Sequence, residues 1–431
     1  MATNTAAQLD ALFIQYHEKV ISPQFPQATP FLNQLKEAGP EWKVNAKGWK
    51  SNAYLRQEAS NVWGLPGLSF PVGGTTVDKN FYVYRAVYGK SYVIDGSTYR
   101  DMKLGNELTL LNERDNINRI MMNAAHEQEQ AAMGDGLGRK SIITSGASTT
   151  VLPLLTTPNG LNASGFGADE LIEGGFYDIL TSAGALADAS HQNVQFPEGS
   201  INRVNNTVTL TTPLGAAPAA NSIIVYTGSY NMYPAGIRYL IDGARTGYFQ
   251  GIDASTEPYL NSPKIDAAQA DISTSLVQNL MVKHIFRNGG QETQRLKVFG
   301  APTQIALYTQ GGWNLVRYDA DKKDFNLGFD TASYGGMQFQ SLVSMDPDVL
   351  VICDLADIRK LIGMKLGVHS EDGLFWRQAS GTNSTNSDNV FANWGYEGNY
   401  AIMQPRRHGI IVNLSVQGMA TQANEFSTTA P

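Results

Sequence analysis

The sequence has few residues that could crosslink the chain or hold a metal ion. Cys353 is the single cysteine among 431 residues, so no disulfide can form within the chain. It lies in the apolar run DVLVICDL, which predicts a buried strand and a structural thiol rather than a nucleophile. The six histidines are scattered, and none has a second histidine at ligand spacing. We therefore expect no metal site and no cofactor.

Charge and long apolar runs are also scarce. Charged residues make up 16% of the chain, and its net charge of -7 is spread without long runs of one sign. The basic stripe typical of nucleic-acid-binding proteins is not visible, so we expect weak binding to duplex DNA. No segment reaches the ~18 apolar residues of a membrane span, and the N-terminus lacks the pattern of a secretion signal. These absences predict a soluble protein made in the cytoplasm.

Catalytic motifs are incomplete. The segment GDGLGRKS is close to a phosphate loop, but Arg139 stands where the loop needs glycine, and a helix rather than a strand precedes it. Asp354 and Asp357 suit a helix cap and first turn better than an acid/base pair. A hydrolase would need a clustered acid, base or nucleophile, and the sequence shows none. We expect a protein that is not an enzyme.

The sequence does contain one long helix, over residues 115–133. Its narrow apolar stripe is rich in alanine and methionine, which favours packing on a broad sheet of the same subunit. Asp115 is the expected N-cap, Gly134 the expected left-handed end, and Glu129 lies off the stripe. The stripe consists of Ile117, Ile120, Met121, Ala124, Gln128, Ala131 and Ala132.

The first fifty residues predict an arm with two short helices, over residues 8–20 and 31–38, separated by the proline-rich SPQFPQATP. Such helices need cover for their apolar side chains. The chain's own domain or a neighbouring subunit could supply it, and both interpretations stay open. The side chains concerned are Leu12, Phe13, Tyr16 and Val20.

Residues 63–100, beginning at Trp63, predict a two-stranded ribbon with a glycine-rich approach. A lone ribbon is barely stable in water, so we expect a neighbouring subunit to cover it. Deleting residues 73–91 should then spare the fold and stop assembly. The aromatic side chains that need cover are Phe81, Tyr82, Tyr84, Tyr88 and Tyr92.

The remaining sequence mixes helices and strands. Helices are expected over residues 168–187 and 272–287, and strands over 206–211, 222–227, 296–299 and 349–353. Residues 141–157 read as a loop, and residues 236–267 as irregular. A helix should follow residue 299, and another should start at Asp354 and end at Gly363. The alternating pattern after residue 389 predicts long antiparallel strands.

This order of segments resembles the major capsid proteins of tailed phages of the Hong Kong 97 type. The resemblance covers residues 63–416. It rests on the order arm, aromatic ribbon, long helix and GDGLG turn, and on the later phrases GIRYLIDGARTGYFQGIDASTEPYLNSPKID, LKVFGAPTQIALYTQ, VLVICDL and QPRRHGIIVNLSV. It implies an α+β fold with an N-terminal arm, an extended β-hairpin loop, a peripheral domain around the long spine helix, and an axial domain.

The resemblance also implies domain limits and candidate contacts. The arm would span residues 1–60, the extended loop 61–103, the peripheral domain 104–145 and 364–431, an accessory insert 146–229, and the axial domain 230–363. Subunit-interface candidates are Leu12, Phe13, Tyr16, Trp63, Phe81, Tyr82, Tyr84, Tyr88 and Tyr92. Spine-helix packing would use Ile117, Ile120, Met121 and Ala124.

The function that follows from the resemblance is a virion shell. Copies of the chain would form hexamers and pentamers of an icosahedral head around double-stranded DNA held without sequence-specific binding. Partners would be further copies, a portal, and scaffolding or decoration proteins, with no membrane. An encapsulin-like nanocompartment shell stays open as the alternative, and a β-rich hydrolase or a phage tail protein is less favoured.

Overall fold

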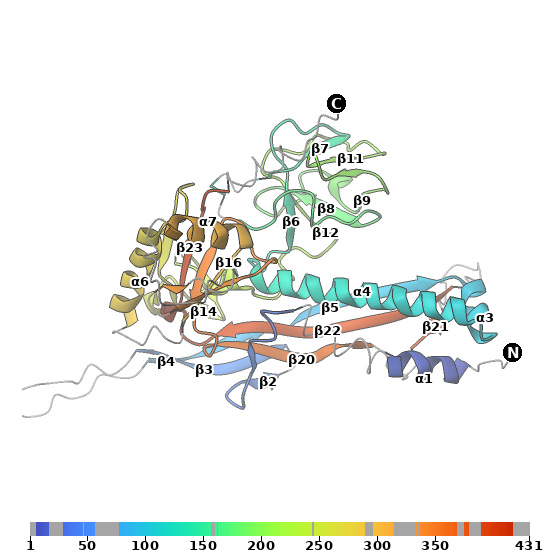
Figure 1. Cartoon of the computed structure of the whole chain (residues 1–431), viewed down its shortest axis with the longest axis horizontal. Helices are drawn as coiled ribbons and strands as arrows, with labels where there is room; N and C mark the ends of the chain where they lie inside the picture. Colours follow the sequence, from blue (N-terminus) through green and yellow to red (C-terminus); the bar gives the residue numbers. More distant parts are fainter. Residues whose placement is uncertain are drawn as a thin grey trace, which may run out of the picture.

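The computed structural model describes residues 6–16, 29–45, 47–56, 77–156, 160–161, 163–243, 245–288, 296–313, 333–334, 337–368, 375–378 and 389–416. The fold is α+β, as expected. It consists of a long platform, a compact part with helices α6 and α7 at one end of it, and a β-rich part beside the end of helix α4 (Figure 1).

The platform is a sheet centred on β22 (Val390–Ile402). On one side β22 pairs antiparallel with β5 (Ala86–Ile94), and on the other with β20 (Ile358–Val368) and β21 (Arg377–Gln378). The short β1 (Lys36–Glu37) adds to β20 in parallel. Helix α4 (Glu107–Met133) runs along β5 and β22, with α3 (Gly96–Lys103) and α1 (Ala6–Tyr16) near its far end (Figure 1).

Helix α4 confirms the predicted stripe but not its predicted ends. Ile117, Met121 and Ala124 are buried, and the first two pack on a cluster that contains Trp394 of β22. Ile120 is partly buried against the same cluster. The helix begins at Glu107, where the Asn106 side chain accepts a hydrogen bond from the Thr109 N–H, so Asp115 is not its N-cap.

The end of α4 also differs from the prediction. Gly134 has φ of -72° and is extended, so it is not the left-handed residue. The left-handed residues are Gly136 and Gly138, with φ of 80° and 74°. They turn the chain into the next strand, a conformation that glycine adopts without steric cost.

The predicted ribbon of residues 63–100 is wrong, because its two strands pair with other strands and not with each other. Strand β4 (Val77–Tyr84) pairs with β3 (Gly48–Arg56), which also pairs with β2 (Lys43–Asn45), whereas β5 pairs with β22. One residue, Arg85, separates β4 from β5, and YRA lacks the Asn-Gly type of pair that closes a tight hairpin. The chain therefore passes from one sheet into the next. Trp63 lies outside the described residues.

The compact part is a six-stranded sheet with α6 (Thr274–Asn288) and α7 (Pro302–Trp313). Both helices were expected, and Cys353 is buried in a strand as predicted. The strand order is β15 (Lys264–Asp266), β23 (Gly409–Val412), β19 (Leu350–Cys353), β16 (Lys297–Gly300), β18 (Met337–Ser341) and β17 (Ser333–Tyr334).

Two predictions about the C-terminal third are corrected. The segment after Asp354 is the strand β20 rather than a helix, because its pairing along β22 and the burial of Ile358 and Leu361 outweigh its helical pattern. Asp354 instead closes a turn by accepting from the Ala356 N–H. Strand β23, assigned to the peripheral domain, lies in the six-stranded sheet of the compact part.

The β-rich part contains two small sheets. One is ordered β6 (Arg139–Ile142), β12 (Ile223–Tyr226), β8 (Phe176–Leu180) and β9 (Val194–Gln195). The other is ordered β10 (Ile201–Asn202), β11 (Thr207–Thr209) and β7 (Val151–Pro153). The strands expected near residues 206 and 222 are confirmed. The loop over 141–157 and the helix over 168–187 are wrong, since β6, β7 and β8 occupy those segments; Gly174 and Gly184, both with positive φ, interrupt the helical pattern.

The remaining elements are short. The segment of residues 236–267 is irregular as expected except at its end, where β15 pairs with β23. It also holds the short elements α5 (Ile237–Leu240), β13 (Tyr248–Phe249), β14 (Ile252–Asp253) and η3 (Pro258–Leu260), while η2 (Ala189–His191) and η6 (Pro405–Arg407) lie elsewhere. Residues 31–38 form a turn and β1 rather than a helix. The first predicted helix is present as α1, and residues 17–20 lie outside the described part.

Candidate functional site

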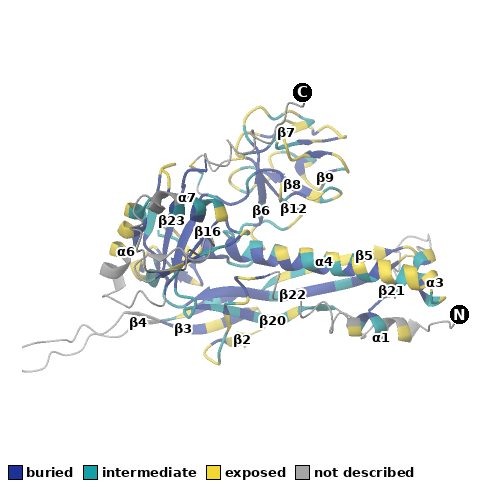
Figure 2. Ribbon diagram, viewed as in Figure 1, coloured by how far each residue is buried: buried dark blue, intermediate teal, exposed yellow. Residues whose placement is uncertain are grey.

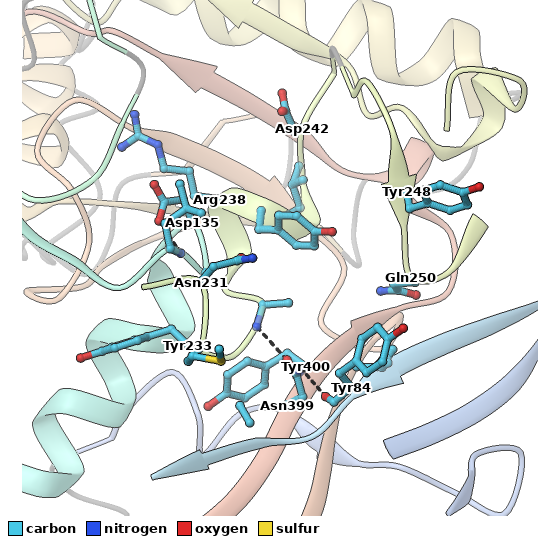
Figure 3. A pocket seen from close by; sticks show the side chains of 18 of the residues that line it. Tyr84, Asp135, Asn231, Tyr233, Arg238, Asp242, Tyr248, Gln250, Asn399 and Tyr400 are labelled. Atoms are coloured by element: carbon cyan, nitrogen blue, oxygen red, sulfur yellow. Dashed lines mark hydrogen bonds between the residues drawn. The ribbon is translucent and has the colours of Figure 1, made fainter. Parts of the chain in front are cut away.

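A cleft of about 1060 Å³ lies where the platform meets the compact part (Figure 3). Its walls are Tyr82 and Tyr84 of β4, the turn after α4, the segment of residues 231–242, and Tyr248 of β13. Asn399 of β22 fixes two of these walls together. Its amide donates to the Tyr84 carbonyl at 2.7 Å and its oxygen accepts from the Ala235 N–H at 2.7 Å.

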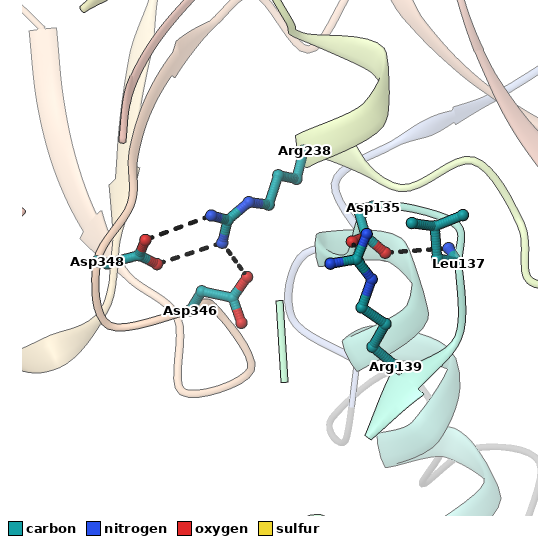
Figure 4. A network of polar contacts seen from close by, with 6 residues as sticks. All are labelled: Asp135, Leu137, Arg139, Arg238, Asp346 and Asp348. Carbon is teal, nitrogen blue, oxygen red and sulfur yellow. Dashed lines mark hydrogen bonds and ion pairs between the residues drawn. The ribbon is translucent and has the colours of Figure 1, made fainter. Parts of the chain in front are cut away.

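A buried ion network closes one side of the cleft (Figure 4). Arg238 of α5 contacts Asp346 at 2.6 Å and Asp348 at 3.2 Å, and the carboxylates precede β19. Burial raises the pKa of Asp346, and the charge of Arg238 opposes the rise. The two carboxylates and Arg238 therefore tie the irregular segment to the six-stranded sheet, and removing one partner would leave a buried charge unpaired.

The other cations that line the cleft are paired as well. Arg85 lies 2.9 Å from Glu397, and Lys264 lies 3.0 Å from Asp242. Arg139 contacts Asp135 at 3.4 Å. With its charges compensated and tyrosine rings on its walls, the cleft suits contact with another polypeptide surface better than binding of an isolated anion.

A second polar cluster joins α4 to the β-rich part. Lys140 of β6 lies 3.9 Å from Glu127 of α4 and 3.8 Å from Glu170. The Tyr226 hydroxyl donates to Glu127 at 2.8 Å, and burial raises the pKa of Tyr226, so the hydroxyl stays a neutral donor. The long helix thus holds this part through charge-assisted contacts.

The groups that could carry catalysis have structural partners. The Asp354 N–H donates to Nδ1 of His408 at 3.2 Å, and Nε2 of His191 lies 2.9 Å from the Ala216 carbonyl. Burial raises the pKa of the Cys353 thiol, which keeps it protonated. Among the residues that the structure describes, no group of three or more histidine, cysteine or acidic side chains could hold a metal ion. None of the described helices is long and apolar enough to cross a membrane.

Two predicted interface residues are internal instead. Phe13 of α1 is buried and stacks on Phe375 and against Trp376, with both ring centroids at 5.4 Å. Phe81 is buried in the main core beneath β3 and β4. Both side chains are therefore unavailable to a neighbouring subunit. The prediction assigned too much uncovered aromatic surface to the ribbon, because the sequence does not show which elements cover each ring.

The other predicted interface residues are distributed differently. Tyr84 is 67% exposed, which suits the prediction. The Tyr92 hydroxyl donates to Glu113 of α4 at 2.6 Å, so this ring lies between sheet and helix. Leu12, Tyr82 and Tyr88 are partly buried, and the side chain of Tyr16 lies outside the described ones.

Apolar side chains missed by the sequence reasoning are exposed on the platform. Leu108 and Leu111 of α4 are 68% and 55% exposed, and Leu104, which caps the end of α3, is 55% exposed. Figure 2 shows exposed positions along α3 and the first part of α4. Val87 and Val93 project from β5, whose other edge pairs with no strand among the described residues. Part of this was visible in the sequence, because Leu108 and Leu111 are spaced i and i+3, which places them on one side of a helix.

Among the known proteins compared with this chain, only solved structures are similar to it. No family model matches the chain, and no curated protein matches it. The cyanophage A-1(L) capsid asymmetric unit is similar at a TM-score of 0.45 and 10% identity, over 90% of this chain and 93% of that one. The capsid of a native GTA particle gives 0.45 and 10%, over 90% of each chain. A chain of Gordonia phage Cozz gives 0.41 and 9%, over 90% of this chain and 87% of that one.

Proposed function

We propose that the chain is a major capsid protein, whose copies form hexamers and pentamers of an icosahedral phage head around double-stranded DNA. Its place would then be the virion, with a portal and scaffolding or decoration proteins as further partners. The observation that carries the proposal is that one edge of β5 is unpaired among the described strands, together with the exposed valines of β5 and leucines near the start of α4.

The platform exposes backbone groups and apolar side chains that another chain could cover. A long edge strand offers unpaired N–H and C=O groups to another chain, and soluble monomers usually block such edges. Fully burying a leucine or valine side chain stabilises by about 1.5–3 kcal/mol, so covering Leu108, Leu111, Val87 and Val93 favours association. Permanent assemblies bury more than ~2,000 Å² per interface, and an elongated platform offers room for such contacts.

The proposed domains correspond to the separate sheets of the structure. The platform with α4 would be the peripheral domain, and the six-stranded sheet the axial domain. Strands β3 and β4 would form the base of the extended loop, and the β-rich part would be an accessory insert. The tyrosine-lined cleft between platform and compact part would receive part of a neighbouring copy.

Expression of the chain alone tests the proposal. We expect negative-stain microscopy to show shells, sheets or ring-shaped capsomers, and sedimentation velocity to show species far larger than one subunit. A monodisperse monomer at micromolar concentration would contradict the proposed function. A particle that packs a protein cargo in place of DNA during production in the phage host would favour the nanocompartment alternative.

A further inference from the structure

The outer face of the sheet β2, β3 and β4 has an unusual composition. The inner face of β3 and β4 carries Trp49, Ala53, Phe81 and Val83 of the main core. Near the turn between β2 and β3 the opposite face consists of lysine, asparagine and tyrosine, whereas Asp78 of β4 pairs with Tyr54 at the other end of the sheet. Its described members are Lys43, Asn45, Lys50, Asn52 and Asn80, with Lys47 in the connecting turn and with Tyr82 and Tyr84 at its border with the cleft.

Positive charge is concentrated on this face without internal compensation. Lys43 and Lys50 stand directly opposite each other in the β2 and β3 pairing, and both are exposed. Like charges at such positions are destabilising. Within the described residues, none of Lys43, Lys47 and Lys50 has an ion-pair partner, and the nearby Glu41 is directed to Arg359 at 3.7 Å.

The polar groups beside the lysines are held in place. The Tyr82 hydroxyl donates to the Asn45 side chain at 3.2 Å, and the Tyr82 and Tyr84 rings meet edge to face at 5.2 Å. Asn45 also accepts from the backbone N–H groups of Lys47 and Gly48, both at 2.9 Å, which fixes the turn. Lys43 and Lys50 therefore project from paired strands, and Lys47 lies beside them in a turn that is bonded to Asn45.

We propose that this surface contacts the phosphate backbone of duplex DNA without reading its sequence. Lysine, asparagine and tyrosine are side chains that bind phosphate oxygens. Lysine is depleted in protein–protein interfaces, which disfavours a second copy as the occupant. On a chain with a net charge of -7, a cluster of three lysines without ion-pair partners among the described residues is complementary to a polyanion. The inference rests on the proposed function for the source of the DNA, because a capsid subunit meets packaged duplex.

The proposal adds a small basic cluster to a chain that was expected to lack a basic stripe, and it agrees with the expected weak binding to duplex DNA. The net charge conceals the cluster, because the pairing of β2 with β3 brings Lys43, Lys47 and Lys50 together. With so few phosphate contacts, affinity at physiological salt stays in the range of about 10⁻⁴–10⁻⁶ M that is usual for non-specific binding.

The test measures binding of the purified full-length chain to duplex DNA by fluorescence anisotropy over a series of salt concentrations. Two unrelated duplex sequences serve as probes. The variant Lys43→Gln/Lys47→Gln/Lys50→Gln should flatten the plot of log K against log salt by about 2.7, since each phosphate contact contributes a slope of ~0.9. Melting of the variant should not fall, because the substitutions are exposed and remove a repulsion.

The matched control is Lys90→Gln/Lys103→Gln/Lys283→Gln, which changes the net charge equally at other elements. It should leave the slope nearly unchanged. Equal slopes for both variants would overturn the proposal. So would unchanged DNA binding together with a lost particle yield, which would assign the face to a second copy. If the wild type forms no particles but the slopes differ as expected, the capsid function fails and the phosphate contact stands.

Discussion

Glu129 shows at the scale of one residue why a sequence pattern can misplace a side chain. It is 1% exposed, although its charge placed it off the apolar stripe of α4. Its two carboxylate oxygens accept from the backbone N–H groups of Phe31 and Leu32, at 2.7 and 3.1 Å. These donors lie 98 and 97 residues away in the chain, so no local pattern could reveal them.

Replacing Glu129 with alanine should lower the free energy of unfolding by about 1–3 kcal/mol, because two buried N–H groups lose their acceptor. Chemical denaturation of the subunit measures the change. His126→Ala, an exposed position on the same helix, is the matched control and should be nearly neutral. Equal loss in both variants would mean that Glu129 does not anchor the segment of Phe31.

The ionisation of Glu129 predicts a pH dependence. Burial raises its pKa above the ordinary 4.5, while the bonds from Phe31 and Leu32 and the charge of Lys360 oppose the rise. The folded state binds the proton of Glu129 more tightly than the unfolded state does. The group therefore contributes its full stabilisation below pH 4.5, and this contribution falls as the pH rises through the raised pKa. The stability difference between wild type and Glu129→Ala should therefore grow towards acid pH. A difference that is constant with pH would contradict the raised pKa.

At the scale of elements, helix α4 was the most predictable part of the fold. Its stripe of Ile117, Met121 and Ala124 follows the helical period, and the sheet covers that stripe. The ends were not predictable to the same degree, because the cap at Asn106 competes with several polar residues of similar propensity. Leu108 and Leu111 lie on another side of α4 and are exposed in the subunit.

Ala124→Arg should destabilise the subunit by several kcal/mol, on the order of 3–5, because it places an unpaired charge and excess volume at a fully buried position. Asn123→Arg, exposed on the neighbouring position of the same helix, should be tolerated. Thermal melting followed by circular dichroism compares the two. A soluble Ala124→Arg protein that melts like the control would show that the assigned face of α4 is incorrect.

The strands were less predictable, because pairing partners lie far apart in sequence. Nothing local to β5 identifies β22 as its neighbour, yet the two pair from Ala86 with Gly398 to Ile94 with Val390. The expected outcome of deleting residues 73–91 is therefore reversed. That deletion removes β4 and much of β5, so it should unfold the subunit rather than spare it.

Substitution tests the β5 surface without removing the strand. Val87→Lys/Val93→Lys should leave the subunit's melting within the small range of surface changes, since both side chains are exposed, but should lower particle yield at least tenfold. Val204→Lys/Val343→Lys alters two other exposed valines and is the control for added charge. Sedimentation of cell extracts gives the yield. Normal shells from the β5 variant would mean that this strand is not an assembly contact.

At the scale of the whole molecule, the sequence predicted the α+β class and the order of the main segments, because these depend on local periodicity. It could not predict that β23 and β15 join in the six-stranded sheet, or that β1 adds to β20 in parallel. Both contacts need closure of long loops, and their free energy depends on packing that no window of sequence contains. The cleft also depends on contacts between distant segments. The sequence therefore indicated its tyrosines only as aromatic residues of a ribbon and not as walls of one cleft.

The open platform predicts that assembly and stability are coupled. Neighbouring copies would cover the β5 edge and the exposed Leu104, Leu108 and Leu111, and they would bind the folded subunit but not the unfolded chain. The melting temperature should therefore rise with protein concentration, because mass action favours the bound, folded state. A tenfold change in the concentration of free partner shifts the equilibrium by about 1.4 kcal/mol for one independent contact, and several contacts per subunit add to this. Differential scanning calorimetry of the wild type at increasing concentrations should show this rise, and Val87→Lys/Val93→Lys should show a lower, concentration-independent transition near that of the dissociated subunit. If both proteins melt at the same temperature at every concentration, the exposed apolar rows do not mediate association, and the physical support for a shell-forming subunit is lost.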